Sequence, residues 1–237
     1  MTPERYDRIN DTLKRRQPDL TVITEELYKP HNISAIARTC DAFAVQDVHA
    51  VWPRKEVRLR TATAAGSDSW VTVNTHPTVS DAIGHLKAQG MKVCCAHLTD
   101  RAMDFREYDF TQPTAILMGA EKEGVSDEAA ELADEHLIIP MLGMVHSFNV
   151  SVAAAIILCE AARQRQAAGM FEQRRIDDTR YQQLLFEWCQ PTITKLCHKY
   201  DLPYPEMRED GELADPQAFS RQVNECYRQL DKNTENN

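Results

Sequence analysis

The chain reads TAILMGAEKEG over residues 114–124, an apolar run that ends in two glycines around three charged side chains. The run predicts a buried strand over 114–118, and the glycines of the following loop let backbone approach a ligand closely. The loop has neither the GxGxxG nor the P-loop spacing, which disfavours NAD and ATP sites. A helix-entry turn with a solvated acidic cluster is the alternative interpretation of the same residues.

Outward from this strand, apolar strands alternate with helices, which predicts an α/β fold. We expect an open, mainly parallel sheet covered on both faces. The predicted strands are 20–25, 47–52, 70–74, 91–97, 114–118 and 136–140. The predicted helices are 32–44, capped by Asn32, 80–89, 126–133, capped by Ser126 or Asp127, and 149–168, with helical appendages at 2–16, 179–200 and 217–230.

Composition sets broad limits. The 237 residues are 43% hydrophobic and 27% charged, which excludes a wholly disordered chain. No apolar run approaches a membrane span, and the charged N-terminus lacks a signal peptide. The seven cysteines contain no CxxC pair, and the apolar surroundings of Cys94 and Cys95 favour buried free thiols over bridges. We therefore expect a cytosolic protein.

The net charge and the local charge distribution give opposite indications about binding to nucleic acid. The formal net charge of −9 is unfavourable for binding a polyanion. Residues 161–175, however, carry four arginines against one glutamate, so a positive field would be local. Solvated helix faces are the alternative interpretation of such clusters.

Two further segments could carry chemistry. Residues 139–149 read IPMLGMVHSFN, an apolar loop that suits a flat uncharged ligand such as an adenine ring. Ser147 and Asn149 open the helix after it and could equally be its caps. Earlier, residues 31–38 read HNISAIAR, where Arg38 could contact an anion or form a salt bridge. The histidines lack metal spacing, and His31, His97 and His146 are interpreted as polar rim residues.

Together and in this order, these segments resemble the SpoU–TrmH family of SPOUT RNA 2′-O-ribose methyltransferases. The similar segments are NISAIARTCDA at 32–42, ILMGAEKEGV at 116–125, and IIPM at 138–141 followed by SFNVSVA at 147–153. Shorter stretches at 15–22, 29–32, 104–107 and 163–165 extend the resemblance to roughly residues 1–175.

The resemblance implies a deep trefoil knot near the C-terminal end of the catalytic domain, formed by loops at 96–100, 119–124 and 139–148. The third loop would then lie inside the molecule, around the methyl donor S-adenosylmethionine. It also implies a homodimer with the active site near the subunit interface. The expected domains are a basic helix at 1–17 that contacts tRNA, a catalytic domain at 18–168 and an acidic helical extension at 169–237.

The implied reaction is methyl transfer to the ribose 2′-hydroxyl of a guanosine in tRNA, guanosine 18 of the D-loop, without a metal or a membrane. The implied catalytic residues are Asn32, Arg38, Glu121, Ser147 and Asn149. The implied donor-binding positions are Ala96, Met118, Gly119, Ile139 and Phe148. The implied RNA contacts are Arg8, Arg15, Arg16, His31, Arg163 and Arg165.

Three positions depart from the family pattern. Ala44 replaces a common glycine, Ala96 a frequent threonine and Phe148 the usual leucine. Two other functions stay open: the same chemistry on ribosomal RNA, and a knotted domain that binds RNA without modifying it. The short segment before Gln17 favours tRNA, because relatives that act on ribosomal RNA carry a separate N-terminal domain.

Overall fold

The computed structural model describes residues 1–27, 29–52, 70–120 and 123–235. Their contacts divide the chain into two compact units. One unit is Arg15–Arg175, and the other combines Met1–Lys14 with Ile176–Asn237. None of the described helices is long and apolar enough to cross a membrane.

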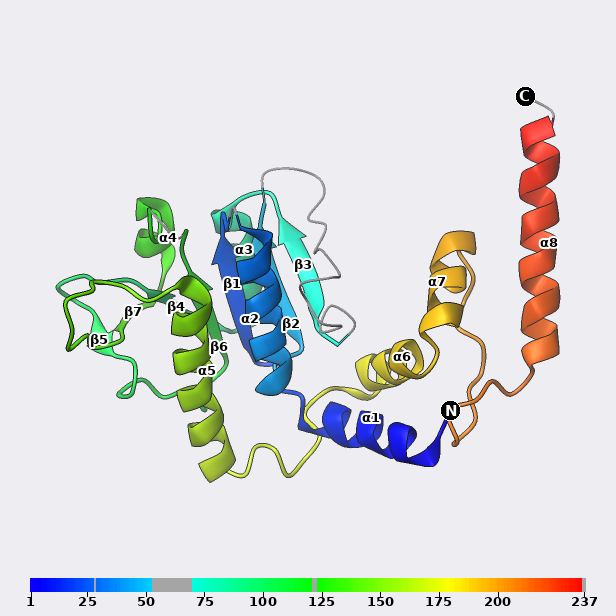
Figure 1. Ribbon diagram of the computed structural model, residues 1–237, viewed down its shortest axis with the longest axis horizontal. Coiled ribbons are helices and arrows are strands. Elements are labelled where there is room, and N and C mark those ends of the chain that lie inside the picture. Colours follow the sequence, from blue (N-terminus) through cyan, green and yellow to red (C-terminus); the bar gives the residue numbers. More distant parts are fainter. Residues whose placement is uncertain (28, 53–69, 121–122, 236–237) are drawn as a thin grey trace. The chain divides into compact units, whose positions relative to one another are not determined.

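The larger unit is built on a parallel sheet of seven strands, in the order β3-β2-β1-β6-β4-β7-β5 (Figure 1). This confirms the predicted open parallel α/β sheet. The strands are β1 (Leu20–Glu25), β2 (Asp47–Val51), β3 (Thr72–His76), β4 (Lys92–Ala96), β5 (Met103–Asp104), β6 (Thr114–Met118) and β7 (Glu135–Ile138). The two-residue strand β5 was not predicted, because it is too short to show alternation.

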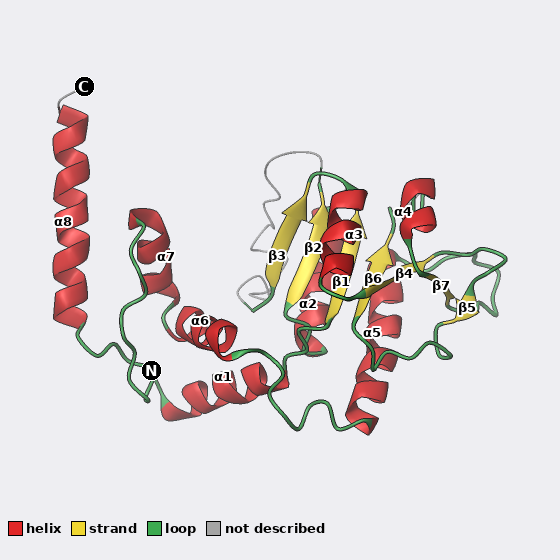
Figure 2. Cartoon of the chain, turned by 180° about the vertical axis from the view of Figure 1, so that it is seen from behind, coloured by secondary structure: helices red, strands yellow, loops and turns green. Residues whose placement is uncertain are grey.

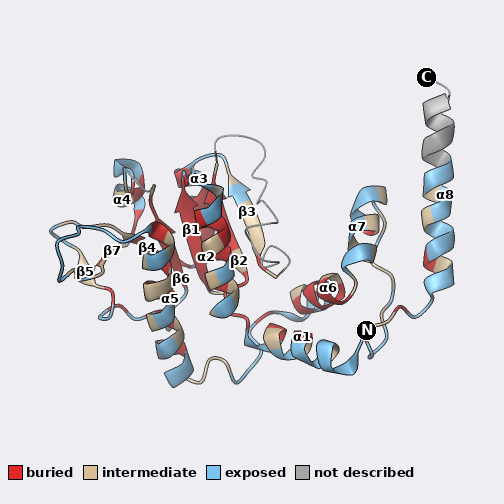
Figure 3. Ribbon diagram, viewed as in Figure 1, coloured by how far each residue is buried: buried red, intermediate tan, exposed pale blue. Residues whose placement is uncertain are grey.

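Helices cover both faces of this sheet (Figure 1, Figure 2). On one face α2 (Pro30–Ala42) and α5 (Val150–Ala167) pack against β1, β4 and β6, and on the other α3 (Val79–Ala88) and α4 (Asp127–Leu132) do so. The alternation of a strand appears at Cys94 and Cys95, which are both fully buried but belong to opposite cores. Both are free thiols, as predicted. The central strands are the most buried part of the unit (Figure 3).

Two predicted caps are confirmed and one is wrong. Ser126 Oγ accepts from the Ala129 N–H, and Asn149 accepts from the Ser151 N–H. Helix α2 instead starts at Pro30 with Lys29 as its N-cap, which places Asn32 inside the helix. The reason is that proline is favoured in the first helical turn, where its missing N–H costs no hydrogen bond.

Ala44, which stands where the family commonly has glycine, has a φ of 61°. This left-handed conformation costs a side-chain-bearing residue about 1–2 kcal/mol. The turn that joins α2 to β2 therefore has a conformation that favours glycine, the residue that the family resemblance implies at this position.

The smaller unit is helical, with α1 (Pro3–Arg15), α6 (Asp178–Cys189), α7 (Pro191–Tyr200) and α8 (Pro216–Glu235). Its small core contains Phe186, Cys197, Leu213 and Phe219. The single helix predicted over 179–200 is two helices, because Pro191 lacks the N–H that would continue the first.

Candidate active site

A cavity of about 530 Å³ opens at the carboxyl ends of β4, β6 and β7. All five positions predicted to bind the donor lie on its wall: Ala96, Met118, Gly119, Ile139 and Phe148. They come from three separate segments, at residues 96, 118–119 and 139–148, which the parallel strands bring to one edge of the sheet. The location agrees with the rule that ligands bind beyond the carboxyl ends of strands.

The loop after β6 is closed tightly beneath this cavity. The Ala120 N–H donates to Gly124 O at 2.7 Å, and the Gly124 N–H donates to Ala120 O at 2.9 Å. A Cβ added to Gly119 would lie 2.2 Å from the Gly124 carbonyl. Only glycine therefore fits at position 119, which leaves backbone groups as the floor of the cavity. Glu121, a predicted catalytic residue, lies outside the described residues.

The apolar loop before α5 differs from its prediction. It was expected inside the molecule, but Leu142 and Met144 are 102% and 94% exposed. Only its two ends reach the cavity wall, through Ile139, Met141 and the segment from His146 to Asn149. The middle of the loop thus leaves apolar surface exposed on the described chain.

The start of α5 meets the start of α2 through two asparagines. Asn149 Oδ1 accepts from the Ser151 N–H at 2.9 Å and from Ser151 Oγ at 2.6 Å. With its oxygen held there, the Asn149 amide nitrogen donates to Asn32 Oδ1 at 3.4 Å. Asn149 is therefore both a cap and a cavity residue, and Ser147 lies beside it on the wall.

Arg38 does not line this cavity. It lies on an exposed stripe of α2 together with His31, seven residues and about two turns earlier. Among the described residues, no ion pair of Arg38 is found, so the alternative of a local salt bridge gains no support. The structure places the predicted catalytic arginine and His31 on the same helix face.

The predicted RNA-binding arginines divide into two groups. Arg8, Arg15 and Arg163 are exposed. Arg163 also pairs with Glu160 at 2.7 Å, a local salt bridge between residues one turn apart on α5. Arg16 and Arg165 have fully buried side chains, which contradicts the prediction that they contact RNA.

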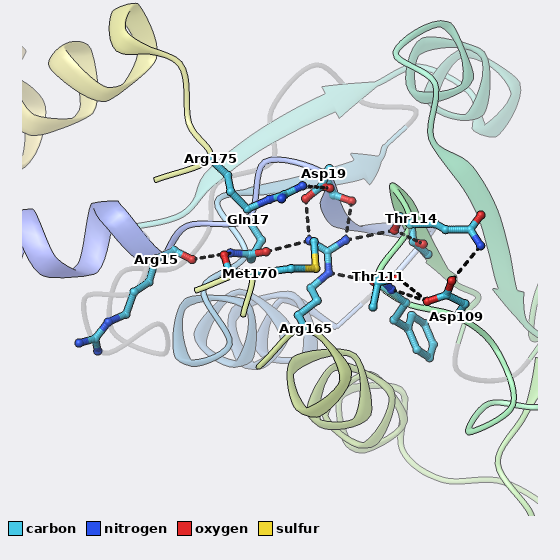
Figure 4. Close-up of polar contacts among 11 residues, drawn as sticks. Arg15, Gln17, Asp19, Asp109, Thr111, Thr114, Arg165, Met170 and Arg175 are labelled. Carbon is cyan, nitrogen blue, oxygen red and sulfur yellow. Dashed lines mark hydrogen bonds and ion pairs between the residues drawn. The ribbon is translucent and has the colours of Figure 1, made fainter. Parts of the chain in front are cut away.

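Both buried arginines hold the larger unit together instead. Arg16 pairs with Asp41 at 2.5 Å and donates to two backbone carbonyls beyond it, those of Val45 and Trp70. Arg165 pairs with Asp19 at 2.6 Å and donates to the carbonyls of Phe110 and Gln112 (Figure 4). Because both side chains are fully buried and bonded within the protein, neither guanidinium is available to a phosphate.

Asp19 is the common partner in this network. Partial burial raises its pKa, but hydrogen bonds and charges from Arg165 and Arg175 outweigh that effect and hold the pKa below its ordinary value. The carboxylate is therefore ionised at neutral pH, which balances the buried charge of Arg165.

Several cavity residues had no predicted role. Lys29 and Glu123 bring one charge of each sign to the wall, and His97 and His146, interpreted from sequence as rim residues, also lie there. Glu123 lies inside the 116–125 motif and Lys29 inside the 29–32 stretch, so their position in the sequence was the available signal.

Comparison with known proteins places these features in a family. Residues 19–159 match the SpoU rRNA Methylase family, and residues 163–216 match the C-terminal region "SpoU, rRNA methylase, C-terminal". The tRNA (guanosine(18)-2′-O)-methyltransferase of Escherichia coli is 54% identical over 215 residues, covering 90% of this chain and 94% of the relative. The Thermus thermophilus protein of that name is 52% identical, covering 79% of this chain and 96% of its own length.

Solved structures agree. The A. aeolicus TrmH/SpoU tRNA modifying enzyme has a TM-score of 0.73 and 36% identity, covering 78% of this chain and 94% of its own. The Streptomyces viridochromogenes SpoU methyltransferase AviRb, solved with the cofactor AdoMet, has a TM-score of 0.56 and 26% identity, covering 65% and 59%. The chain belongs to the SpoU methylase family.

Proposed function

We propose that this chain transfers a methyl group from S-adenosylmethionine to the ribose 2′-hydroxyl of guanosine 18 in tRNA. The observation that carries the proposal is the convergence of two separate motifs, those at 116–125 and 138–153, on one cavity, in a chain 54% identical to a tRNA (guanosine(18)-2′-O)-methyltransferase. The identity extends over 90% of the chain, which favours tRNA over ribosomal RNA as the substrate.

The residues present fit the donor. Met118 and Gly119 lie on the cavity wall, where a Cβ at Gly119 would collide with the Gly124 backbone, and Ile139 and Phe148 add apolar wall for an adenine ring. Glu123 offers a carboxylate to an ammonium group, and Lys29 offers an ammonium to a carboxylate. S-adenosylmethionine supplies a methyl group on a positively charged sulfur, which is a good leaving group.

Arg38 is proposed to act on the RNA rather than on the donor. The guanidinium of an arginine is almost never neutral in a protein, so it is poorly suited to be a base. Its exposed guanidinium can instead bind the phosphate next to the reacting ribose and stabilise the developing alkoxide. The hydroxyl proton then leaves to the phosphate or to water.

A homodimer and the trefoil knot are part of the proposal. On α5, Val152 and Cys159 are exposed and Ile156 is half-buried, which makes an apolar stripe along one side of the helix. A second copy covering this stripe and the exposed loop around Leu142 would remove both from water. Sedimentation of the pure protein as a monomer at micromolar concentration would contradict the dimer.

The test combines mapping with one variant. Purified protein, tRNA transcript and donor should give 2′-O-methylguanosine at position 18, detected by mass mapping of nuclease fragments. Arg38→Ala should lower this rate by about a thousandfold or more, because charge stabilisation in the transition state is lost. Calorimetry should show the donor's Kd unchanged within a few-fold, since Arg38 does not line the cavity.

Three results would contradict parts of the proposal. Methylation at another position or only in ribosomal RNA would remove the assigned substrate. Loss of donor affinity in Arg38→Ala would place the guanidinium in the donor site. In Arg38→Lys, retained activity with a lowered apparent pKa would favour general-base catalysis over phosphate binding.

A further inference from the structure

A second cavity lies away from the active site, beside the end of α5. Its volume is about 350 Å³, within the range of small-molecule sites, and its wall consists of Arg15, Gln166, Gly169, Phe171 and Glu172. We propose that this cavity binds one unpaired base of the RNA, with guanine preferred. The inference rests on the proposed function, since it adds a subsite for the same RNA.

A buried side chain forms hydrogen bonds to the backbone on two sides of this cavity. Gln17 is fully buried, and its amide nitrogen donates to Arg15 O at 2.9 Å and to Met170 O at 3.1 Å (Figure 4). The oxygen of the same amide accepts from Arg165 at 3.0 Å. Two sides of the cavity, 155 residues apart in sequence, are thereby fixed to the Asp19 network. Gly169, Phe171 and Glu172 come from the loop after α5, and this loop is anchored to the buried network through Met170.

A tight turn sets the third side. Gly169 has a φ of 70°, and the Glu172 N–H donates to its carbonyl at 3.1 Å. The Glu172 carboxylate lies over this turn, 3.5 Å from the place that a Cβ of Gly169 would occupy. A glycine at this point both permits the left-handed conformation and leaves room for the carboxylate.

The side chains offer the groups that read an unpaired base. Phe171 and the planar guanidinium of Arg15 are stacking surfaces for a ring. Figure 4 shows the Arg15 guanidinium directed away from the buried network. Among the residues that the structure describes, no hydrogen bond or ion pair holds the side chains of Arg15, Gln166 or Glu172, so their polar ends are available to a ligand.

Glu172 decides between possible ligands. A carboxylate repels a phosphate, which disfavours binding of the RNA sugar-phosphate backbone in this cavity. It accepts hydrogen bonds through two oxygens, and guanine presents two neighbouring donors, N1–H and the N2 amino group, on its Watson–Crick edge. The other bases present one donor group on that edge. Guanine is therefore the base that satisfies both oxygens at once.

Steady-state kinetics with an unmodified tRNA transcript tests the subsite. Phe171→Ala should raise the KM for tRNA about fivefold or more, from the loss of one stacked base, with kcat nearly unchanged. Phe171→Trp should keep the wild-type KM, because it retains a stacking surface. Tyr227→Ala removes another exposed aromatic ring, on α8, and is the matched control.

Base identity is tested by replacing the unpaired guanosines of the transcript one at a time with adenosine. With the wild-type protein, one of these replacements should raise the KM for tRNA. With Glu172→Gln, the same replacement should change the KM little, because this variant has already lost the carboxylate. Wild-type KM in both Phe171→Ala and Glu172→Gln would overturn the subsite, as would a Glu172→Gln penalty that every transcript shares. The proposed function fails separately, when the wild-type protein leaves guanosine 18 unmethylated.

Discussion

The two edges of the one sheet are built in opposite ways. At the amino edge, Asp19 and Gln112 precede β1 and β6, and Arg165 makes five hydrogen bonds to the chain around them. At the carboxyl edge, β4, β6 and β7 end at a cavity of about 530 Å³ with exposed apolar residues at its rim. Because all strands are parallel, their amino ends lie together at one edge and their carboxyl ends lie together at the other. The amino edge is closed by side chains, which leaves the carboxyl edge free for ligands.

The contrast is sharpest for the two arginines near the end of α5. Arg165 faces the amino edge and is fully buried, whereas Arg163 is exposed and pairs with Glu160. The largest effect is expected from Arg165→Ala, which leaves Asp19 without its main buried partner. The free energy of unfolding should fall by about 3–5 kcal/mol.

Urea unfolding measures this loss, and Arg163→Ala is the control on the same helix. Its stability should stay close to that of the wild-type protein, because an exposed pair contributes little. Equal stability losses in the two variants would mean that the amino-edge network is no more important than a surface salt bridge.

An intermediate effect is expected at the carboxyl edge. Gly119→Ala would force the loop after β6 open, since the new methyl group would lie 2.2 Å from Gly124. The donor's Kd should rise about a hundredfold, which corresponds to about 2.7 kcal/mol. Calorimetry with S-adenosylmethionine measures the change.

Gly143→Ala is the matched control in the neighbouring loop, where an added Cβ meets nothing within 4 Å. Its donor affinity should stay within a few-fold of the wild-type value. A normal Kd for Gly119→Ala would show that the tight Gly119 loop is not part of the donor site.

The smallest effect concerns pH. Arg175 is the more exposed partner of Asp19, so Arg175→Ala should cost roughly 0.2–1 kcal/mol at neutral pH. The lowered pKa of Asp19 contributes stability above the ordinary carboxyl pKa, and this contribution is lost as the pH falls through the lowered value. The stability difference between wild-type protein and Arg175→Ala should therefore close in acid.

Thermal unfolding from pH 7 to pH 3 tests this dependence, with Arg221→Ala as a variant that removes the same charge from α8. A difference that stays constant with pH would show that Arg175 stabilises the fold by packing rather than through the Asp19 charge.

Much of the fold could be predicted from local pattern. The strand over Thr114–Met118 matches its prediction at both ends, because an apolar run between a proline and a glycine is unambiguous. The caps at Ser126 and Asn149 followed from residue type. The start of α2 was not predicted, because both Pro30 and Asn32 are residues that favour the beginning of a helix. The break before Pro191 was not predicted, because the only local signal was a single proline inside a helical pattern.

The sequence by itself determined the α/β class, the family, and the segments that form the cavity wall. These depend on periodicity and on motifs, which are local properties of a chain. Only the tertiary structure decided that Arg16 and Arg165 are buried while Arg15 and Arg163 are exposed, although each pair is separated by at most two residues. It also decided that Gln17 joins Arg15 to Met170 and so shapes a second cavity. The physical reason is that burial depends on which distant segments pack against a residue, and one-dimensional order does not contain that information.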